Sequence, residues 1–170
     1  TYLGELGYEL HVPVEYALHL YERLWAAGQA LGIANVGYRA INTLRLEKHY
    51  LVWGSDITPD YNPYEAGVGF CVALGSQAEF LARDALAAVK AQGPQRRLAW
   101  FTAPPEPTLH GGEVVFAGER MLGRVTSGGF GHTVGRNIFC AYIAADEAAS
   151  AEITIEVMGQ RYPAVRHTRP

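Results

Sequence analysis

Residues 121–143 read MLGRVTSGGFGHTVGRNIFCAYI. The two ends of this stretch, 121–126 and 138–143, are short apolar runs rich in β-branched and aromatic residues, which predicts two strands. Between them, residues 127–135 form a glycine-rich bend. This bend lacks the GxxxxGK[ST] spacing of a phosphate-binding loop and does not lead into a helix. We therefore interpret the stretch as two strands joined by a bend rather than as a nucleotide site.

The pattern of short strands separated by turn residues extends to both sides of this stretch. The other predicted strands are residues 97–103, 113–117, 153–157 and 162–167. About six strands in so short a region favour a closed barrel or a sandwich, because an open sheet would leave its edges exposed. Gln92, Gly93 and Pro94 form a stop signal before the first strand. We predict a domain boundary there, with domains at 1–92 and 93–170.

The first 92 residues have a mixed pattern. Alternating apolar and polar side chains at 8–12 predict a half-buried strand. Helical spacing from Val14 to about residue 31 predicts an amphipathic helix that packs on a sheet. Further predicted elements are a helix over 35–47, an irregular segment over 53–63, a buried strand over 68–74 and a helix over 78–91. The fold class is therefore α+β.

Composition excludes several classes of function. The chain has 170 residues, is 49% hydrophobic and carries a formal net charge of −3. No positive field suits a nucleic acid or a membrane surface, and no apolar run is long enough to span a bilayer. Six histidines show no metal-ligand spacing, so we expect no metal. Cys71 and Cys140 lie in apolar runs and are predicted to be buried free thiols in a reducing compartment.

Two charged residues are candidates for ligand binding. Glu9 lies opposite the apolar face of the predicted strand, and a carboxylate can accept two parallel N–H donors, as from an arginine or a pterin edge. Arg39 can pair with Glu9 or bind an acidic ligand. The alternatives are an ordinary exposed glutamate and an ion pair between Arg39 and Glu47 or another acid on its helix.

The remaining polar and aromatic residues are less specific. Arg45, Glu47 and Lys48 are interpreted as a solvated or interface face. Aromatic rings near these residues in sequence can stack on a flat heterocycle, although most are expected to pack in the core or loops. No Ser-His-Asp or Cys-His arrangement and no pair of carboxylates suggests catalysis. We predict no catalytic residue in the chain.

Several motifs, in order along nearly the whole chain, resemble the glycine cleavage T-protein (aminomethyltransferase) superfamily. They are YLGELGYELHVP at 2–13, GYRAINTLRLEK at 37–48, WGSDI at 53–57, NPYEAG at 62–67, GRVTSG at 123–128 and GRNI at 135–138. The last two resemble that family's C-terminal barrel. The resemblance implies the end of a folate-binding α/β domain followed by a six-stranded antiparallel β-barrel. Its details are most similar to the folate-binding region of sarcosine and dimethylglycine dehydrogenases.

The resemblance implies tetrahydrofolate as the small-molecule ligand and assigns residues to it. Glu9 matches the family glutamate that holds the pterin edge, Arg39 the arginine of the folate site, and Tyr2 a tyrosine that positions the ligand. Two departures are His49, where the motif usually has glycine, and Tyr64, where leucine is common. In those dehydrogenases an FAD domain and the acid/base aspartate lie upstream of the matched region. We therefore expect the chain to be inactive without upstream polypeptide.

The leading hypothesis is a region of a methylated-glycine dehydrogenase that passes a one-carbon unit to tetrahydrofolate. The alternatives are a glycine cleavage aminomethyltransferase, which would use a lipoyl carrier protein, and a non-catalytic folate-binding scaffold. The expected location is the cytoplasm in a bacterium or the mitochondrial matrix in a eukaryote. Because the chain starts at Thr1 without a leader, we expect it to be a fragment with exposed apolar patches near that end.

Overall fold

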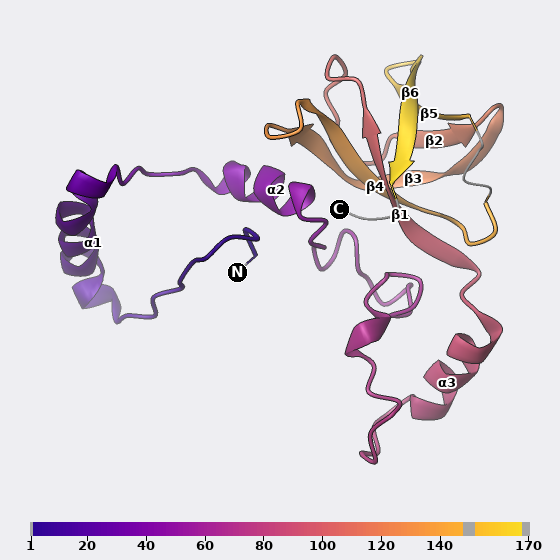
Figure 1. Ribbon diagram of the computed structural model, residues 1–170, viewed down its shortest axis with the longest axis horizontal. Coiled ribbons are helices and arrows are strands. Elements are labelled where there is room, and N and C mark those ends of the chain that lie inside the picture. The colour runs from indigo at the N-terminus through magenta and orange to yellow at the C-terminus, as the bar shows by residue number, and fades with distance from the viewer. Residues whose placement is uncertain (1, 148–151, 168–170) are drawn as a thin grey trace.

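Six antiparallel strands form a closed barrel at the C-terminal end of the chain (Figure 1). The computed structural model describes residues 2–147 and 152–167. The strands are β1 (Arg96–Ala103), β2 (Val114–Ala117), β3 (Arg120–Gly131), β4 (Arg136–Ala144), β5 (Ile153–Val157) and β6 (Gln160–His167). Around the barrel their order is β1-β4-β3-β2-β5-β6, and β6 pairs with β1. The predicted α+β class and six-stranded antiparallel barrel are confirmed.

Alternating side chains of the strands fill the barrel. Its interior contains the stacked rings of Phe101 and Phe139, with centroids 5.0 Å apart. β4 is buried almost continuously, unlike β6, which alternates. Phe139, Ala141 and Ile143 of β4 belong to the core cluster. The opposite face of β4 is covered by the polypeptide before the barrel. This strand therefore packs against both parts of the chain.

β3 is longer than predicted. The chain continues as a strand through Gly131, so most of the expected glycine-rich bend is part of the sheet. A register shift between Val125 and Ser127 accommodates the strand against β4. Gly129 approaches Leu46 of the preceding region closely enough that a Cβ would lie 3.2 Å from its Cδ1. Glycines here serve close packing, and the turn itself is confined to residues 132–135.

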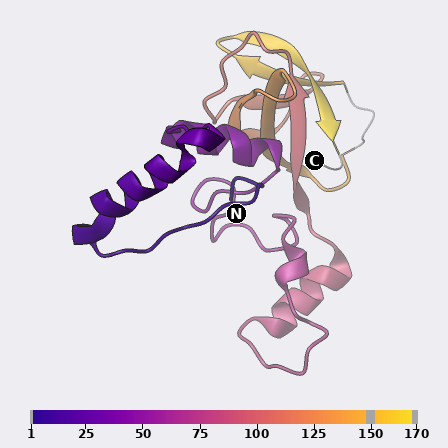
Figure 2. The same ribbon diagram turned by 60° about the vertical axis from the view of Figure 1, so that its left-hand side comes forward.

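The first part of the chain consists of separate helices and irregular segments. They are α1 (Val14–Gly28), η1 (Gln29–Leu31), α2 (Tyr38–Glu47), η2 (Gly69–Cys71) and α3 (Arg83–Gln92). α2 packs against β3 and β4. α1 lies far from the barrel in Figure 1, and in Figure 2 its first turns point away from the barrel. The irregular segment predicted over 53–63 is confirmed apart from one bridge, between Trp53 and Ile57.

Four predictions for this region are wrong. Residues 8–12 form no strand, because no neighbouring strand pairs with them among the described residues. α1 has no buried residue and packs on no sheet. Residues 68–74 include the 3-10 turn η2 instead of a buried strand, and Cys71 is exposed while Cys140 is buried. The apolar side chains expected to be exposed near the N-terminus are exposed, among them Leu6, Tyr8, Leu10 and Val14.

Candidate functional site

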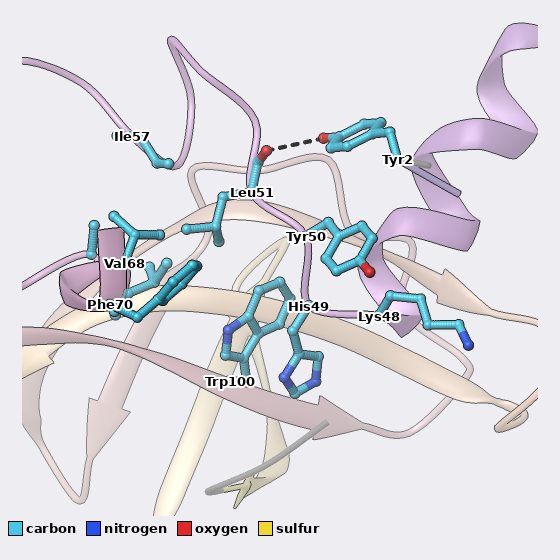
Figure 3. A pocket seen from close by; sticks show the side chains of 12 residues that line it. Tyr2, Lys48, His49, Tyr50, Leu51, Ile57, Val68, Phe70 and Trp100 are labelled. Carbon is cyan, nitrogen blue, oxygen red and sulfur yellow. Dashed lines mark hydrogen bonds between the residues drawn. The ribbon is translucent and has the colours of Figure 1, made fainter. Parts of the chain in front are cut away.

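A cavity of about 720 Å³ lies where the segment after α2 meets the barrel (Figure 3). Its walls come from Tyr2, the end of α2, the loop that follows it, the segment around η2, and β1. The lining residues are Tyr2, Lys48, His49, Tyr50, Leu51, Ile57, Ala66, Gly67, Val68, Phe70, Leu98 and Trp100. Aromatic and aliphatic side chains predominate, and such a surface suits a flat, mostly apolar ligand.

Tyr2 forms one rim of this cavity. Its hydroxyl donates a hydrogen bond to the backbone carbonyl of Leu51 at 3.2 Å, and its ring stacks with that of Tyr50 at a centroid distance of 6.3 Å (Figure 3). The pKa of the Tyr2 phenol is raised, first by burial; the charge of Arg45 lowers it and that of Asp56 raises it. Of the three predicted site residues, Tyr2 is the one that lines the cavity.

His49 and Trp100 form the opposite side of the cavity. Their rings are stacked, with centroids 4.1 Å apart and planes 4° from parallel. The backbone of His49 has φ 55°, a left-handed conformation that favours glycine. Burial, with a smaller effect of His167, lowers the pKa of His49 to about 4. The imidazole is therefore neutral at physiological pH and contributes no charge to the cavity.

A buried ion pair lies directly behind the loop that lines the cavity. Arg45 Nη1 and Asp56 Oδ2 are 3.0 Å apart, and the two residues are 2% and 0% exposed. Arg45 was predicted to belong to a solvated or interface face with Glu47 and Lys48, and its burial excludes the solvated alternative for this residue. The helix turns this side chain toward β3, where Ser127 Oγ accepts a hydrogen bond from Nη2 at 2.8 Å.

Glu9 and Arg39 lie outside this cavity. The Glu9 side chain is 88% exposed, and its Oε2 is 3.8 Å from His11 Nε2. Arg39 is exposed on the first turn of α2. The structure joins neither residue to the other by an ion pair, nor Arg39 to Glu47, in the described part of the chain. Glu47 instead accepts a hydrogen bond from the backbone N–H of Thr133 at 2.7 Å.

Sequence reasoning missed Phe70 and Trp100 as cavity residues. Phe70 is 86% exposed and lies beside the cavity near Val68, and Trp100 belongs to β1 (Figure 3). They are separated by thirty positions, and neither belongs to a motif that indicates a ligand. The nearest signal was the concentration of aromatic residues between Tyr50 and Tyr64.

A metal-binding cluster and a membrane-spanning helix are both absent from the described ranges. Over residues 2–147 and 152–167, no three His, Cys, Asp or Glu side chains are grouped so that they could hold a metal ion. No helix in the same ranges has the length and apolar character needed to cross a membrane.

The chain combines an irregular helical region with a small closed barrel, and an aromatic cavity lies at their junction. Residues 1–76 match the family model described as the GCVT N-terminal domain. Residues 96–170 match the model of the glycine cleavage T-protein C-terminal barrel domain. The chain belongs to the glycine cleavage T-protein superfamily.

Similar proteins include two oxidative enzymes and a solved aminomethyltransferase. The chain is 36% identical to 4-methylaminobutanoate oxidase (formaldehyde-forming) of Paenarthrobacter nicotinovorans, in a match that covers the whole chain and 21% of that enzyme. The chain is 37% identical to mitochondrial dimethylglycine dehydrogenase of Rattus norvegicus, in a match that covers 96% of this chain and 19% of that enzyme. The crystal structure of glycine cleavage system aminomethyltransferase T from Bartonella henselae matches 92% of this chain and 44% of that chain, with 28% identity and a TM-score of 0.81. The chain thus spans about a fifth of the length of these two oxidative relatives.

Proposed function

We propose that this chain is the tetrahydrofolate-binding C-terminal region of a larger one-carbon transfer enzyme of the sarcosine or dimethylglycine dehydrogenase type. The observation that carries the proposal is the aromatic cavity at the junction of two regions that both match the T-protein family. The oxidative relatives, each about five times as long as the matched region, favour this type of enzyme.

The cavity has the chemistry that tetrahydrofolate needs. Its stacked and half-exposed rings offer flat surfaces for a heterocycle and an aminobenzoyl ring, and the neutral His49 does not oppose either. Glu9 and Arg39 both lie outside the cavity. The Glu9 carboxylate is almost fully exposed, so both oxygens are accessible to a pair of N–H donors. The Arg39 guanidinium is accessible to an acidic ligand tail. We assign Tyr2 to positioning the ligand at the cavity rim.

The contribution of this region to the reaction is positioning. A folate nitrogen held beside the carbon donor reacts as if the two were parts of one molecule, which removes much of the entropic cost of their encounter. This chain binds and orients the folate and shields one side of it from water. In the proposed enzyme, upstream polypeptide supplies the acid/base aspartate and an FAD domain, so the chain alone is inactive.

The proposal is tested by titrating tetrahydrofolate into the full-length protein and following the heat of binding. Glu9→Ala removes a charge-assisted pair of hydrogen bonds and is expected to weaken binding by about 10- to 100-fold. Glu106→Ala, which removes an exposed carboxylate in a barrel loop, is the matched control and leaves the affinity unchanged. Equal affinities of the wild type and the Glu9→Ala variant would reject the assignment of Glu9.

The second candidate is a glycine cleavage aminomethyltransferase, which would accept its one-carbon unit from a lipoyl carrier protein. The favouring observation is the fold similarity to the Bartonella henselae aminomethyltransferase. The visible absorption spectrum of the purified full-length protein separates the two. Flavin absorbance together with oxidation of sarcosine or dimethylglycine supports the dehydrogenase. A flavin-free protein that is active only with a lipoyl carrier supports the aminomethyltransferase.

A further inference from the structure

Three consecutive residues beside the cavity are held through their backbone. The carbonyl of Tyr50 accepts a hydrogen bond from Arg45 Nη1 at 3.0 Å. The N–H of Val52 donates to Asp56 Oδ2 at 2.9 Å. Between these two points, the carbonyl of Leu51 accepts the hydrogen bond from the Tyr2 hydroxyl at 3.2 Å. The Arg45–Asp56 pair therefore fixes the Tyr50–Leu51 peptide group and the Leu51–Val52 peptide group, and the second of these contains the carbonyl that anchors Tyr2.

The guanidinium of Arg45 has no N–H left for a ligand. A guanidinium has five N–H donors, and here Nε and Nη2 both donate to Asn42 Oδ1, at 2.9 and 2.7 Å. The second Nη2 donor reaches Ser127 Oγ. Nη1 donates to Asp56 and to the Tyr50 carbonyl. A side chain with every donor occupied and 2% exposure acts on a ligand only through the groups that it holds.

Asp56 is equally saturated. Its Oδ2 accepts from Arg45 and from the backbone of Val52. Its Oδ1 accepts from Thr126 Oγ1 at 2.6 Å and from Cys140 Sγ at 3.3 Å, and its backbone carbonyl accepts from the Tyr142 hydroxyl at 2.8 Å. Thr126 lies on β3 and Cys140 on β4, so the carboxylate fixes the cavity loop to the barrel wall.

We propose that Arg45 and Asp56 are positioning residues that fix the Leu51 carbonyl, and through it the Tyr2 ring, in the orientation that receives tetrahydrofolate. The proposal rests on the function proposed above. It assigns a role in ligand affinity to an ion pair that no ligand reaches. The two charges also act on the Tyr2 phenol, because Arg45 lowers and Asp56 raises its pKa. A neutral replacement of Asp56 therefore changes both the position and the titration of Tyr2.

The test is a double-mutant cycle in the full-length protein, with tetrahydrofolate affinity and melting temperature as the two measurements. Tyr2→Phe and Asp56→Asn are each expected to weaken binding by roughly 3- to 10-fold, the range of one lost hydrogen bond. The variant carrying both substitutions binds no more weakly than Tyr2→Phe, because Asp56 acts through the Tyr2 hydroxyl. The loss of melting temperature from Asp56→Asn is the same with and without that hydroxyl.

Thr126→Val is the matched control. It removes a hydrogen bond from the same carboxylate, but on Oδ1, which does not contact the cavity loop. We expect a lower melting temperature and an unchanged affinity for tetrahydrofolate. If Asp56→Asn costs the same affinity with and without the Tyr2 hydroxyl, or if Thr126→Val weakens binding equally, the pair is merely structural and the proposal is overturned. Arg45→Lys replaces Asp56→Asn in the cycle if the latter does not fold.

A second measurement separates this proposal from the proposed function. Carbon-13 labelling of tyrosine Cζ gives a resonance for Tyr2, assigned by its loss in Tyr2→Phe. Asp56→Asn is expected to shift the position and the titration of this resonance, whereas Thr126→Val leaves both unchanged. If Asp56→Asn shifts the Tyr2 resonance but the wild-type protein does not bind tetrahydrofolate, the positioning of Tyr2 by Asp56 is supported and the folate assignment is rejected. No shift would reject the positioning itself.

Discussion

Replacing His49 by glycine separates two opposing contributions to the stability of the junction. The left-handed backbone, with φ 55°, costs a non-glycine residue about 1 kcal/mol. The parallel stack on Trp100, with centroids 4.1 Å apart, offsets this by about 0.5–1.5 kcal/mol. His49→Gly is therefore expected to change the free energy of unfolding by less than about 1 kcal/mol at neutral pH. His49→Ala loses the stack and keeps the strain, so it is expected to be about 0.5–1.5 kcal/mol less stable than the wild type.

Acid changes the difference in stability between the wild type and His49→Gly, because histidine binds a proton and glycine does not. Burial lowers the pKa of His49 from 6.5 to about 4 in the folded chain. The unfolded chain therefore binds this proton first, so the stability that the neutral ring provides is present above pH 6.5 and is lost as the pH falls towards 4. The full difference between the pKa values of His49 in the unfolded and folded chains corresponds to about 3 kcal/mol in the free energy of unfolding. Because the ring is only half-buried, solvent screening reduces it to about 1–2 kcal/mol.

Equilibrium urea unfolding, followed by tryptophan fluorescence at about pH 7.5 and about pH 4.5, measures this difference. The wild type should lose about 1 kcal/mol or more relative to His49→Gly on going to the lower pH. His19→Ala, an exposed position on α1, controls for the other groups that titrate in this range. A difference between the wild type and His49→Gly that is the same at both pH values would refute the reasoning.

Two further predictions concern the barrel and the thiols. A Cβ at Gly123 would overlap the backbone carbonyl of Tyr142, so Gly123→Ala is expected to lower the free energy of unfolding by about 2–3 kcal/mol. Gly75 has open space around it, so the control Gly75→Ala is expected to change the free energy of unfolding by less than about 1 kcal/mol. Equal effects of the two substitutions in urea unfolding would contradict this prediction. Iodoacetamide is expected to label the exposed Cys71 in the native chain. Cys140 is buried, and burial and Asp56 raise the pKa of its thiol, so it is expected to react only after denaturation. Intact mass measurement would then show one added group in the native chain and two in the denatured chain.

The barrel could be predicted because its information is local. Each strand is a short apolar run between turn residues, and antiparallel neighbours are joined by short connections, as between β5 and β6. The length of β3 could not be predicted, because glycines at 128, 129 and 131 read as a bend. They are strand residues because Leu109, Leu46 and Ile138 pack where their side chains would be.

The first region was harder to predict because its apolar patterns have no partner in the described residues. Alternation at 8–12 could not show whether another strand pairs with the segment, and all five of its residues are exposed. The apolar stripe of α1 likewise predicts burial, yet Tyr21 and Leu24 of that stripe are exposed. A pattern specifies which face should be buried, and the neighbouring polypeptide decides whether it is. Upstream polypeptide of the proposed enzyme would bury these faces.

The cavity was beyond sequence reasoning for a different reason. Arg45, Glu47 and Lys48 are adjacent in sequence and look like one charged surface, but at the end of α2 each points to a different environment. Arg45 is buried against the barrel, Glu47 binds the β3–β4 turn, and Lys48 Nζ forms an exposed ion pair with Glu5 at 3.2 Å. Only the docking of α2 on β3 and β4 makes Arg45 the buried one, and that docking depends on glycines some eighty residues later. Arg45, which sequence reasoning placed on a solvated or interface face, thus holds the cavity loop to the barrel, because its partners come from distant parts of the chain.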